Sequence, residues 1–330
     1  MGRRTATTRR GYLMSTEAVD PRTTIRGYLE LLRLPNVFTA ITDVLMGYLL
    51  THPSVDNPQL LGFILLGSAC LYLAGMVLND VFDYQVDLAE RPTRPLPAGL
   101  VPMRTAAGLG YVLLAAGLAL GWSAAAAAHT LRTGIVVTLL ALAVWLYDRV
   151  LKRTPLGPLS MGSCRFLNVL LGMSPGAMPW LTSDWVVAGG IGTYITGVTW
   201  FARREAGNSR RWHLLLATLV MGCGLGLLCW FPWSVELPEQ LLRAPYALGL
   251  GSNWILLWLL IGLSIGFRCQ QAIVHPVKLR VQIAIKHALV SLIVIDAAVC
   301  FAAQGQNLWT FGILLLLVPT VFIGRWIYST

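Results

Sequence analysis

Long apolar segments recur along this chain and restrict its fold more than any other feature of the sequence. Segments of roughly 17 to 22 residues are long enough to cross a ~30 Å hydrocarbon core as helices. Because lipid offers no partner to an exposed backbone group, the pattern predicts an all-α, polytopic transmembrane bundle of nine to ten spans. The ten segments cover approximately residues 34–50, 60–78, 105–122, 134–147, 156–173, 185–201, 212–231, 248–267, 287–303 and 308–326.

Composition agrees with a membrane protein and argues against other classes. The chain is 56% hydrophobic and only 12% charged, whereas an ordinary soluble domain is roughly 25% charged. The net charge of +10 does not indicate nucleic-acid binding, because the basic residues lie in short stretches between apolar runs. The six cysteines form no CxxC pair, so we interpret them as reduced apolar residues.

The positions of the basic residues predict the orientation of the bundle. With the N-terminus inside the cell, all of the 25 basic residues except Arg132, Arg165 and Arg243 fall in inner segments. Such a bias is typical of cytoplasmic loops. We therefore expect an integral, multi-pass protein of the cell membrane with a cytoplasmic N-terminus. Residues 1–26 are expected to form a disordered basic tail, followed by one transmembrane domain over residues 27–330.

An acidic cluster follows the second apolar segment. A continuing helix would place Asn79, Asp83 and Asp87 on one face, with Asp80 one turn from Asp83. Carboxylates stacked without basic partners repel one another, so the cluster predicts a bound cation. Mg²⁺ fits best, since it binds through one or two carboxylates together with substrate phosphate oxygens. The alternative is a solvated acidic helix end that forms ion pairs with the arginines downstream.

A basic loop, Arg-Pro-Thr-Arg-Pro-Leu-Pro-Ala-Gly over residues 91–99, comes directly after the acidic cluster. Its three prolines stiffen it, and the guanidinium groups of Arg91 and Arg94 suit bidentate contact with phosphate oxygens. Either arginine alone would also fit a plain inside-positive loop. The neighbouring carboxylates favour a diphosphate site.

These two motifs together, NDxxDxxxD and RPxRPLPxG, resemble the UbiA superfamily of intramembrane prenyltransferases. The stretch from Arg33 to Asn36 looks like the family's RPxN motif, and Tyr147 to Arg153 looks like its YSxxLKR loop. The resemblance implies a bundle of about nine helices around a central cavity that opens laterally to lipid.

The resemblance also implies functional roles for these residues. Mg²⁺ and an isoprenoid diphosphate would bind at Asn79, Asp80, Asp83 and Asp87, with the three carboxylates and Lys152 acting in catalysis. Arg33, Arg91 and Arg94 would bind the diphosphate, while Asn36 and Tyr147 would line the pocket.

The second acidic motif of the family is altered here. Where most members have DxxxD after the sixth span, the chain reads Arg-Arg-Glu-Ala-Gly-Asn-Ser-Arg-Arg over residues 203–211. Glu205 is its one acid, so a second Mg²⁺ is poorly supported, and Arg204 with Glu205 would contact the diphosphate instead. The loop is either an altered diphosphate site or a degenerate one. Residues 201–206 resemble the EboC-like branch of the superfamily.

Two polar positions inside apolar segments are also candidates. Arg165 and Asn168 lie one turn apart, and a membrane-buried arginine usually faces a cavity or a partner. We interpret both as pocket residues, with a structural pairing as the alternative. Asp296 is isolated, and two interpretations of it stay open: a structural acid or an acid that binds the acceptor.

The sequence thus predicts Mg²⁺-dependent transfer of a prenyl group from an isoprenoid diphosphate to an aromatic or other lipophilic acceptor within the bilayer. The alternative is a catalytically degenerate protein that binds an isoprenoid diphosphate or a lipid as a scaffold or carrier. The altered loop favours the second hypothesis, and the intact acidic cluster favours the first.

Overall fold

The computed structural model describes residues 21–176, 178–203, 211–234, 252–305 and 307–326, which are helical apart from turns and short connections. The α-helices are α1 (Pro21–Leu32), α2 (Val37–Thr51), α3 (Pro58–Phe82), α4 (Tyr84–Glu90), α5 (Met103–Ala127), α6 (Leu131–Arg149), α7 (Gly157–Met173), α8 (Thr182–Ala202), α9 (Arg211–Trp230), α10 (Ser252–Val274), α11 (Lys278–Gln304), α12 (Asn307–Leu315) and α13 (Leu317–Trp326). Three 3₁₀ turns, η1 (Leu34–Asn36), η2 (Leu151–Arg153) and η3 (Phe231–Ser234), lie at helix junctions.

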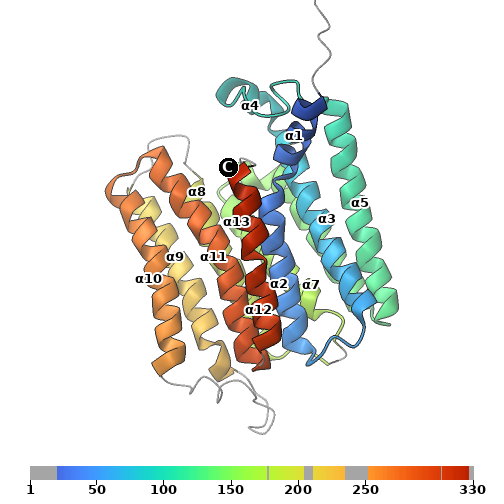
Figure 1. The fold of residues 1–330 in the computed structure, drawn as a ribbon, viewed down its shortest axis with the longest axis vertical. Coiled ribbons are helices and arrows are strands. Elements are labelled where there is room, and N and C mark those ends of the chain that lie inside the picture. The colour runs from blue at the N-terminus through green and yellow to red at the C-terminus, as the bar shows by residue number, and fades with distance from the viewer. Residues whose placement is uncertain (1–20, 177, 204–210, 235–251, 306, 327–330) are drawn as a thin grey trace, which may run out of the picture.

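The long helices run up and down through one bundle, as Figure 1 shows. The short helices α1 and α4 lie at one end of the bundle, together with the C-terminal end of α13. Consecutive long helices alternate in direction, so the α3–α5 connection and the α6–α7 connection reach the same end. Residues far apart in the sequence are therefore brought to one end of the bundle, here called the α4 end.

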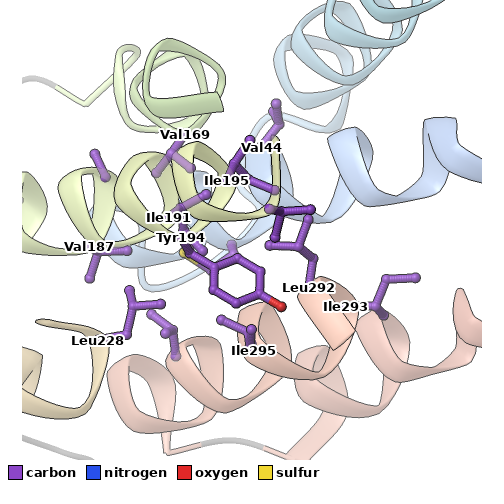
Figure 2. Packing of buried hydrophobic residues seen from close by; sticks show 14 of the residues in the cluster. Val44, Val169, Val187, Ile191, Tyr194, Ile195, Leu228, Leu292, Ile293 and Ile295 are labelled. Atoms are coloured by element: carbon purple, nitrogen blue, oxygen red, sulfur yellow. The ribbon is translucent and has the colours of Figure 1, made fainter. Parts of the chain in front are cut away.

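Small residues let the central helices approach closely. A methyl group on Gly47 of α2 or on Gly172 of α7 would collide with backbone carbonyl oxygens of the facing helix, which is the packing expected between membrane helices. Figure 2 shows the same tight packing around Tyr194 of α8, whose hydroxyl group donates a hydrogen bond of 2.8 Å to the Ala288 carbonyl of α11. These contacts leave little room for water except where polar residues line a cavity.

The structure confirms an all-helical membrane bundle. Each of the ten predicted apolar segments contains helix within its described residues, but eight helical segments of the described chain are long and apolar enough to count as spans. The two that fall short are α7 and α8, which are largely buried among other helices and carry polar groups such as Arg165 and Asp184. Residues 21–26 of the expected tail belong to α1.

Candidate functional site

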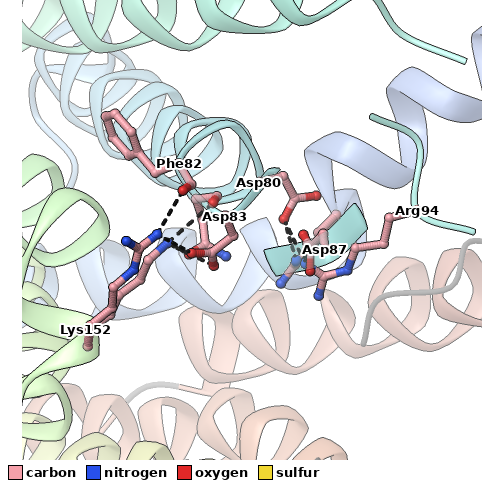
Figure 3. Close-up of polar contacts among 9 residues, drawn as sticks. Asp80, Phe82, Asp83, Asp87, Arg94 and Lys152 are labelled. Atoms are coloured by element: carbon pink, nitrogen blue, oxygen red, sulfur yellow. Dashed lines mark hydrogen bonds and ion pairs between the residues drawn. The ribbon is translucent and has the colours of Figure 1, made fainter. Parts of the chain in front are cut away.

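The acidic cluster lies where α3 ends and α4 begins. The α3 helix stops at Phe82, and Asp83 forms a turn before α4 starts at Tyr84. The prediction of one continuous helix with Asn79, Asp83 and Asp87 on one face is therefore wrong. The bend separates the cluster into two pairs of side chains, which Figure 3 shows facing different cations.

The first pair consists of Asp80 and Asp87, which share Arg94. The Arg94 guanidinium lies 2.7 Å from Asp87 Oδ2 and 3.4 Å from Asp80 Oδ1. Arg33 donates a second hydrogen bond to Asp80 Oδ1 at 2.8 Å. Both aspartates are buried, with 4% of each residue exposed, so each carboxylate is held where it needs a cation.

Local backbone geometry directs both arginines to this pair. Arg33 has a left-handed backbone conformation (φ 45°, ψ 45°) between α1 and η1, which is uncommon for a residue with a side chain. The turn that it forms lets its side chain reach α3. Arg94 follows a tight turn in which its amide bonds the Arg91 carbonyl, and the loop ends at Gly99 with φ 73°.

The second pair consists of Asn79 and Asp83, which share Lys152. Lys152 Nζ lies 2.6 Å from Asn79 Oδ1 and 2.9 Å from Asp83 Oδ2. Arg153 contacts the other oxygen of Asp83 at 3.2 Å and the Phe82 carbonyl at 2.8 Å. Sequence reasoning missed Arg153, although its place directly after Lys152 in the basic 3₁₀ turn was a usable signal.

A polar cleft of about 480 Å³ opens beside the first pair. Asp80, Arg33, Arg91 and Arg94 line it together with residues that the sequence did not single out: Arg26 and Glu30 of α1, and Lys278 and Gln282 of α11. Those residues escaped notice because α1 and α11 are more than 200 residues apart in the chain. The excess of cations over carboxylates in its lining suits an anion with several negative charges.

An apolar cavity of about 60 Å³ lies deeper in the bundle, between α2, α3, α6 and α7. Tyr147, Arg165 and Asn168 line it, as does Asp148, which the sequence places inside the stretch from Tyr147 to Arg153. Such a volume holds a few water molecules. Asp148 was detectable as a carboxylate near the end of an apolar segment.

Arg165 and Asn168 also belong to a buried polar network in the bundle interior. Arg165 donates to Asp43 Oδ2 at 2.7 Å, and Asn168 donates to the same oxygen at 3.3 Å. Asp296 of α11 accepts a hydrogen bond of 2.5 Å from Thr42, the neighbour of Asp43. Sequence reasoning missed Asp43, which was visible as an acid inside the first apolar segment.

The remaining predicted site residues are less closely tied to these clusters. Asn36 lies directly before α2, where its side chain makes no capping hydrogen bond and its carbonyl accepts a hydrogen bond from the Thr39 hydroxyl group. Arg204 and Glu205 lie outside the described residues. Arg203, which precedes them, donates to the Pro155 carbonyl at 3.2 Å beside the loop that carries Lys152.

Residues 40–278 match the model of the UbiA prenyltransferase family, which is well over half of the chain. The chain belongs to the UbiA prenyltransferase family. Its first acidic cluster, the Arg91–Gly99 loop and Lys152 all lie inside the matched region. The likeness of motifs noted in the sequence is thus a true family relationship.

Relatives and solved structures of UbiA proteins extend the comparison. A digeranylgeranylglyceryl phosphate synthase from Metallosphaera sedula is 31% identical over 161 residues, which cover 48% of this chain and 55% of the relative. The chain thus spans about half the length of such relatives. A UbiA homologue from Aeropyrum pernix has a similar fold (TM-score 0.59, 19% identity, 80% of this chain and 96% of that one). A homologue from Archaeoglobus fulgidus bound to GPP and Mg²⁺ is also similar (TM-score 0.56, 16% identity, 85% and 100%).

The donor set of this UbiA chain is compatible with Mg²⁺ but is not arranged as a closed metal site. Within the described residues, no three acidic, histidine or cysteine side chains converge as a metal site. Mg²⁺ does not require that, because it keeps several waters and takes phosphate oxygens as ligands. Asp80 offers hard carboxylate oxygens at the cleft, and Asp87 offers them on the other side of Arg94. Asn79 and Asp83 offer a second oxygen pair.

The expectation that the carboxylates lack basic partners is wrong. Across the described part of the chain, three aspartates of the cluster face four cations, Arg33, Arg94, Lys152 and Arg153. The alternative of a solvated acidic helix end paired with Arg91 and Arg94 holds for the pairing with Arg94, but Asp80 and Asp87 are buried rather than solvated. Because two of these cations, Arg33 and Arg94, also line the cleft, pairing and anion binding are compatible.

Proposed function

We propose that this protein catalyses Mg²⁺-dependent transfer of a prenyl group from an isoprenoid diphosphate to a lipophilic acceptor within the bilayer. The observation that carries the proposal is the cationic cleft beside Asp80, with an apolar cavity deeper in the same bundle. Family membership and the named relatives, which are digeranylgeranylglyceryl phosphate synthases, support it. So do the homologue structures with DMAPP or GPP and Mg²⁺.

The cleft residues act on the diphosphate. Arg33, Arg91 and Arg94 bind its oxygens, and Lys152 holds Asn79 and Asp83 at the junction of α3 and α4. Asp80, Asp83 and Asp87 would hold Mg²⁺, whose charge would neutralise the departing diphosphate. Preorganised cations stabilise that charge without rearranging during the reaction.

The cavity residues act on the prenyl group. Leu71, Met76, Leu140 and Val144 give the cavity an apolar wall, from which a bound prenyl group would displace water. Tyr72 and Tyr147 add aromatic faces to this wall, and aromatic faces stabilise positive charge on an allylic carbon. Exclusion of water favours transfer to the acceptor over hydrolysis.

We further propose that the α4 end faces the cytoplasm and that residues 27–330 form the catalytic domain. The basic residues that follow α3, α6 and α8 support this orientation, since inside loops are enriched in Lys and Arg. The altered loop at Arg204 and Glu205 supports a place in the EboC-like branch and diphosphate binding by arginine.

A second candidate function is a scaffold or carrier that binds an isoprenoid diphosphate without transferring it. The pairing of each carboxylate of the cluster with Arg or Lys favours this reading. A cleft that is already cationic binds diphosphate without a metal. The two functions differ in one measurable property, the appearance of prenylated product.

The test uses the full chain reconstituted in liposomes with labelled isoprenoid diphosphates of several lengths and membrane lipid extract, with and without Mg²⁺. We expect label in an extractable lipid product, lost on chelation of Mg²⁺. Asp83→Asn should lower turnover by roughly 10²- to 10³-fold, as removal of one preorganised electrostatic group does.

Asp56→Asn is the matched control, because Asp56 is an exposed acid in the α2–α3 connection, at the far end of the bundle from α4. It should keep full turnover. If label binds but is never transferred, and Asp83→Asn changes nothing, the scaffold function replaces the enzyme.

A further inference from the structure

Asp148 is a buried carboxylate to which the proposed function assigns no role. It is 2% exposed, it lies at the end of α6, and it lines the apolar cavity. Within the described part of the chain, its Oδ2 atom has no hydrogen-bond partner. An unsatisfied buried carboxylate oxygen is costly, so its persistence at a cavity wall calls for a ligand.

The position of Asp148 relative to the diphosphate site follows from the packing of α3 against α6. Asn79 of α3 contacts Lys152, which comes four residues after Asp148. Gly75, four residues before Asn79, faces Asp148: a methyl group on Gly75 would lie 3.6 Å from Asp148 Oδ2. Asp148 therefore lies one helical turn, about 5 Å, deeper in the bundle than Lys152.

Gly75 also keeps the space in front of Asp148 open. A side chain there would meet Val144 at 3.0 Å as well as Asp148 Oδ2. Gly75 and Asp148 both line the cavity, and the glycine places no side chain between the carboxylate and the cavity.

The chemistry of the site selects the class of group that binds there. A carboxylate in an apolar wall repels an anion and attracts a neutral donor. An amine held there as an ammonium ion has no lone pair with which to attack carbon. A hydroxyl group can donate its hydrogen bond to Asp148 and still present an oxygen lone pair to the allylic carbon.

We propose that Asp148 binds the hydroxyl group of an alcohol acceptor and takes its proton during prenyl transfer. The inference rests on the proposed function and names the acceptor class for it. The carbon–oxygen bond to the diphosphate breaks, and its electron pair leaves with the diphosphate. A lone pair of the hydroxyl oxygen forms the new bond to the same carbon. The proton of that oxygen passes to Asp148 Oδ2, so no other reactant is required.

The first experiment tests the acceptor class. The reconstituted full chain receives labelled geranyl diphosphate and membrane lipid extract, either intact or with its hydroxyl groups acetylated. We expect labelled lipid from the intact extract and almost none from the acetylated one, because acetylation removes the hydroxyl group that would attack the allylic carbon. Equal product from both extracts would overturn the inference while leaving the proposed function in place.

The second experiment tests Asp148 itself. Asp148→Asn keeps the shape of the side chain and should lower acceptor-dependent transfer by about 10²- to 10⁴-fold, the usual range for general acid–base catalysis. Binding of labelled geranyl diphosphate should stay within about twofold, because the cleft cations are intact. Asp148→Glu should recover part of the transfer rate, since it restores a carboxylate.

The controls separate catalysis from folding. Asp184→Asn removes another buried carboxylate, one that accepts a hydrogen bond from the Leu181 amide at the start of α8, and it should leave transfer unchanged. If Asp148→Asn binds donor and transfers it as fast as the wild type, the role of Asp148 is refuted and the proposed function stands. If the wild type transfers label to no fraction of either extract, the proposed function fails and this inference fails with it.

Discussion

The chain holds two clusters of ionic side chains, and they differ in charge balance and in access. The cluster at the α4 end joins Asp80, Asp83 and Asp87 to cations that outnumber them, beside an open cleft. The interior network joins Asp43 and Asp296 around Arg165, with both aspartates fully buried. The first cluster has more cations than carboxylates and lies beside a cleft. The second, here called the closed network, is buried among the helices.

The two clusters use similar residues for different purposes within one membrane bundle. Spare cations at an accessible cleft attract an anion and can exchange partners when it binds. In the closed network each contact replaces lost hydration, so the loss of one partner leaves a buried charge. Mutations should therefore affect activity at the α4 end and stability in the interior.

The largest expected effect is on stability, from Arg165→Met. The guanidinium contacts Asp43 at 2.7 Å and Thr39 at 2.8 Å in the bundle interior. Its removal should cost about 3–5 kcal/mol, as breaking a buried ion pair usually does. Thermal unfolding in detergent measures the loss.

Arg104→Met is the control for that experiment, since Arg104 is exposed near the start of α5, and it should cost less than about 0.5 kcal/mol. The double variant Asp43→Asn with Arg165→Met should recover part of the stability, because fewer charges stay buried and unpaired. Equal stability of Arg165→Met and the wild type would contradict a closed interior network.

The two clusters also differ in how much of each could be predicted from the sequence. The acidic motif, the Arg91–Gly99 loop and Lys152 are local patterns with a chemical meaning, so they could be read without a structure. The partners of Arg165 and the cleft residues Arg26 and Lys278 come from distant helices, and their proximity depends on packing. The spacing of these residues along the sequence does not reveal that they lie close together in the bundle.

The bend at Asp83 shows a second limit. A continuous helix was the simple expectation from residues 79–87, and the amides of Asp83 and Asp87 do make helical hydrogen bonds to residues four positions earlier. Tertiary contacts of Lys152 and Arg153 nevertheless hold Asp83 away from Asp87. The division into two pairs is therefore a property of the bundle, which the local sequence does not encode.

Arg94→Gln should have the next largest effect, this time on activity. Arg94 bridges Asp80 and Asp87 and lines the cleft. Loss of this cation should lower prenyl transfer by about 10²-fold while unfolding free energy falls by roughly 1–3 kcal/mol, the cost of one unsatisfied charged partner. Transfer of labelled isoprenoid diphosphate and thermal unfolding give the two values.

Arg94→Lys sharpens the same test. Lysine keeps the charge but loses the planar fork that can contact two oxygens at once. Its transfer rate should lie between those of Arg94→Gln and the wild type. A rate equal to that of the wild type would show that a point charge suffices, and the bridge between the two aspartates would then have no catalytic value.

Arg153→Gln should have the smallest effect. Its side chain is 55% exposed, whereas that of Lys152, the other partner of Asp83, is 10% exposed. Exposed ion pairs contribute about 0.2–1 kcal/mol, so both unfolding free energy and transfer rate should change little, and less at high salt than at low salt. Parallel assays of Arg153→Gln and Lys152→Gln at both salt concentrations compare them directly. If Arg153→Gln lowered the transfer rate more than Lys152→Gln did, solvent exposure would not explain how the cations of this cluster differ. Arg153 would then have to bind the anion itself.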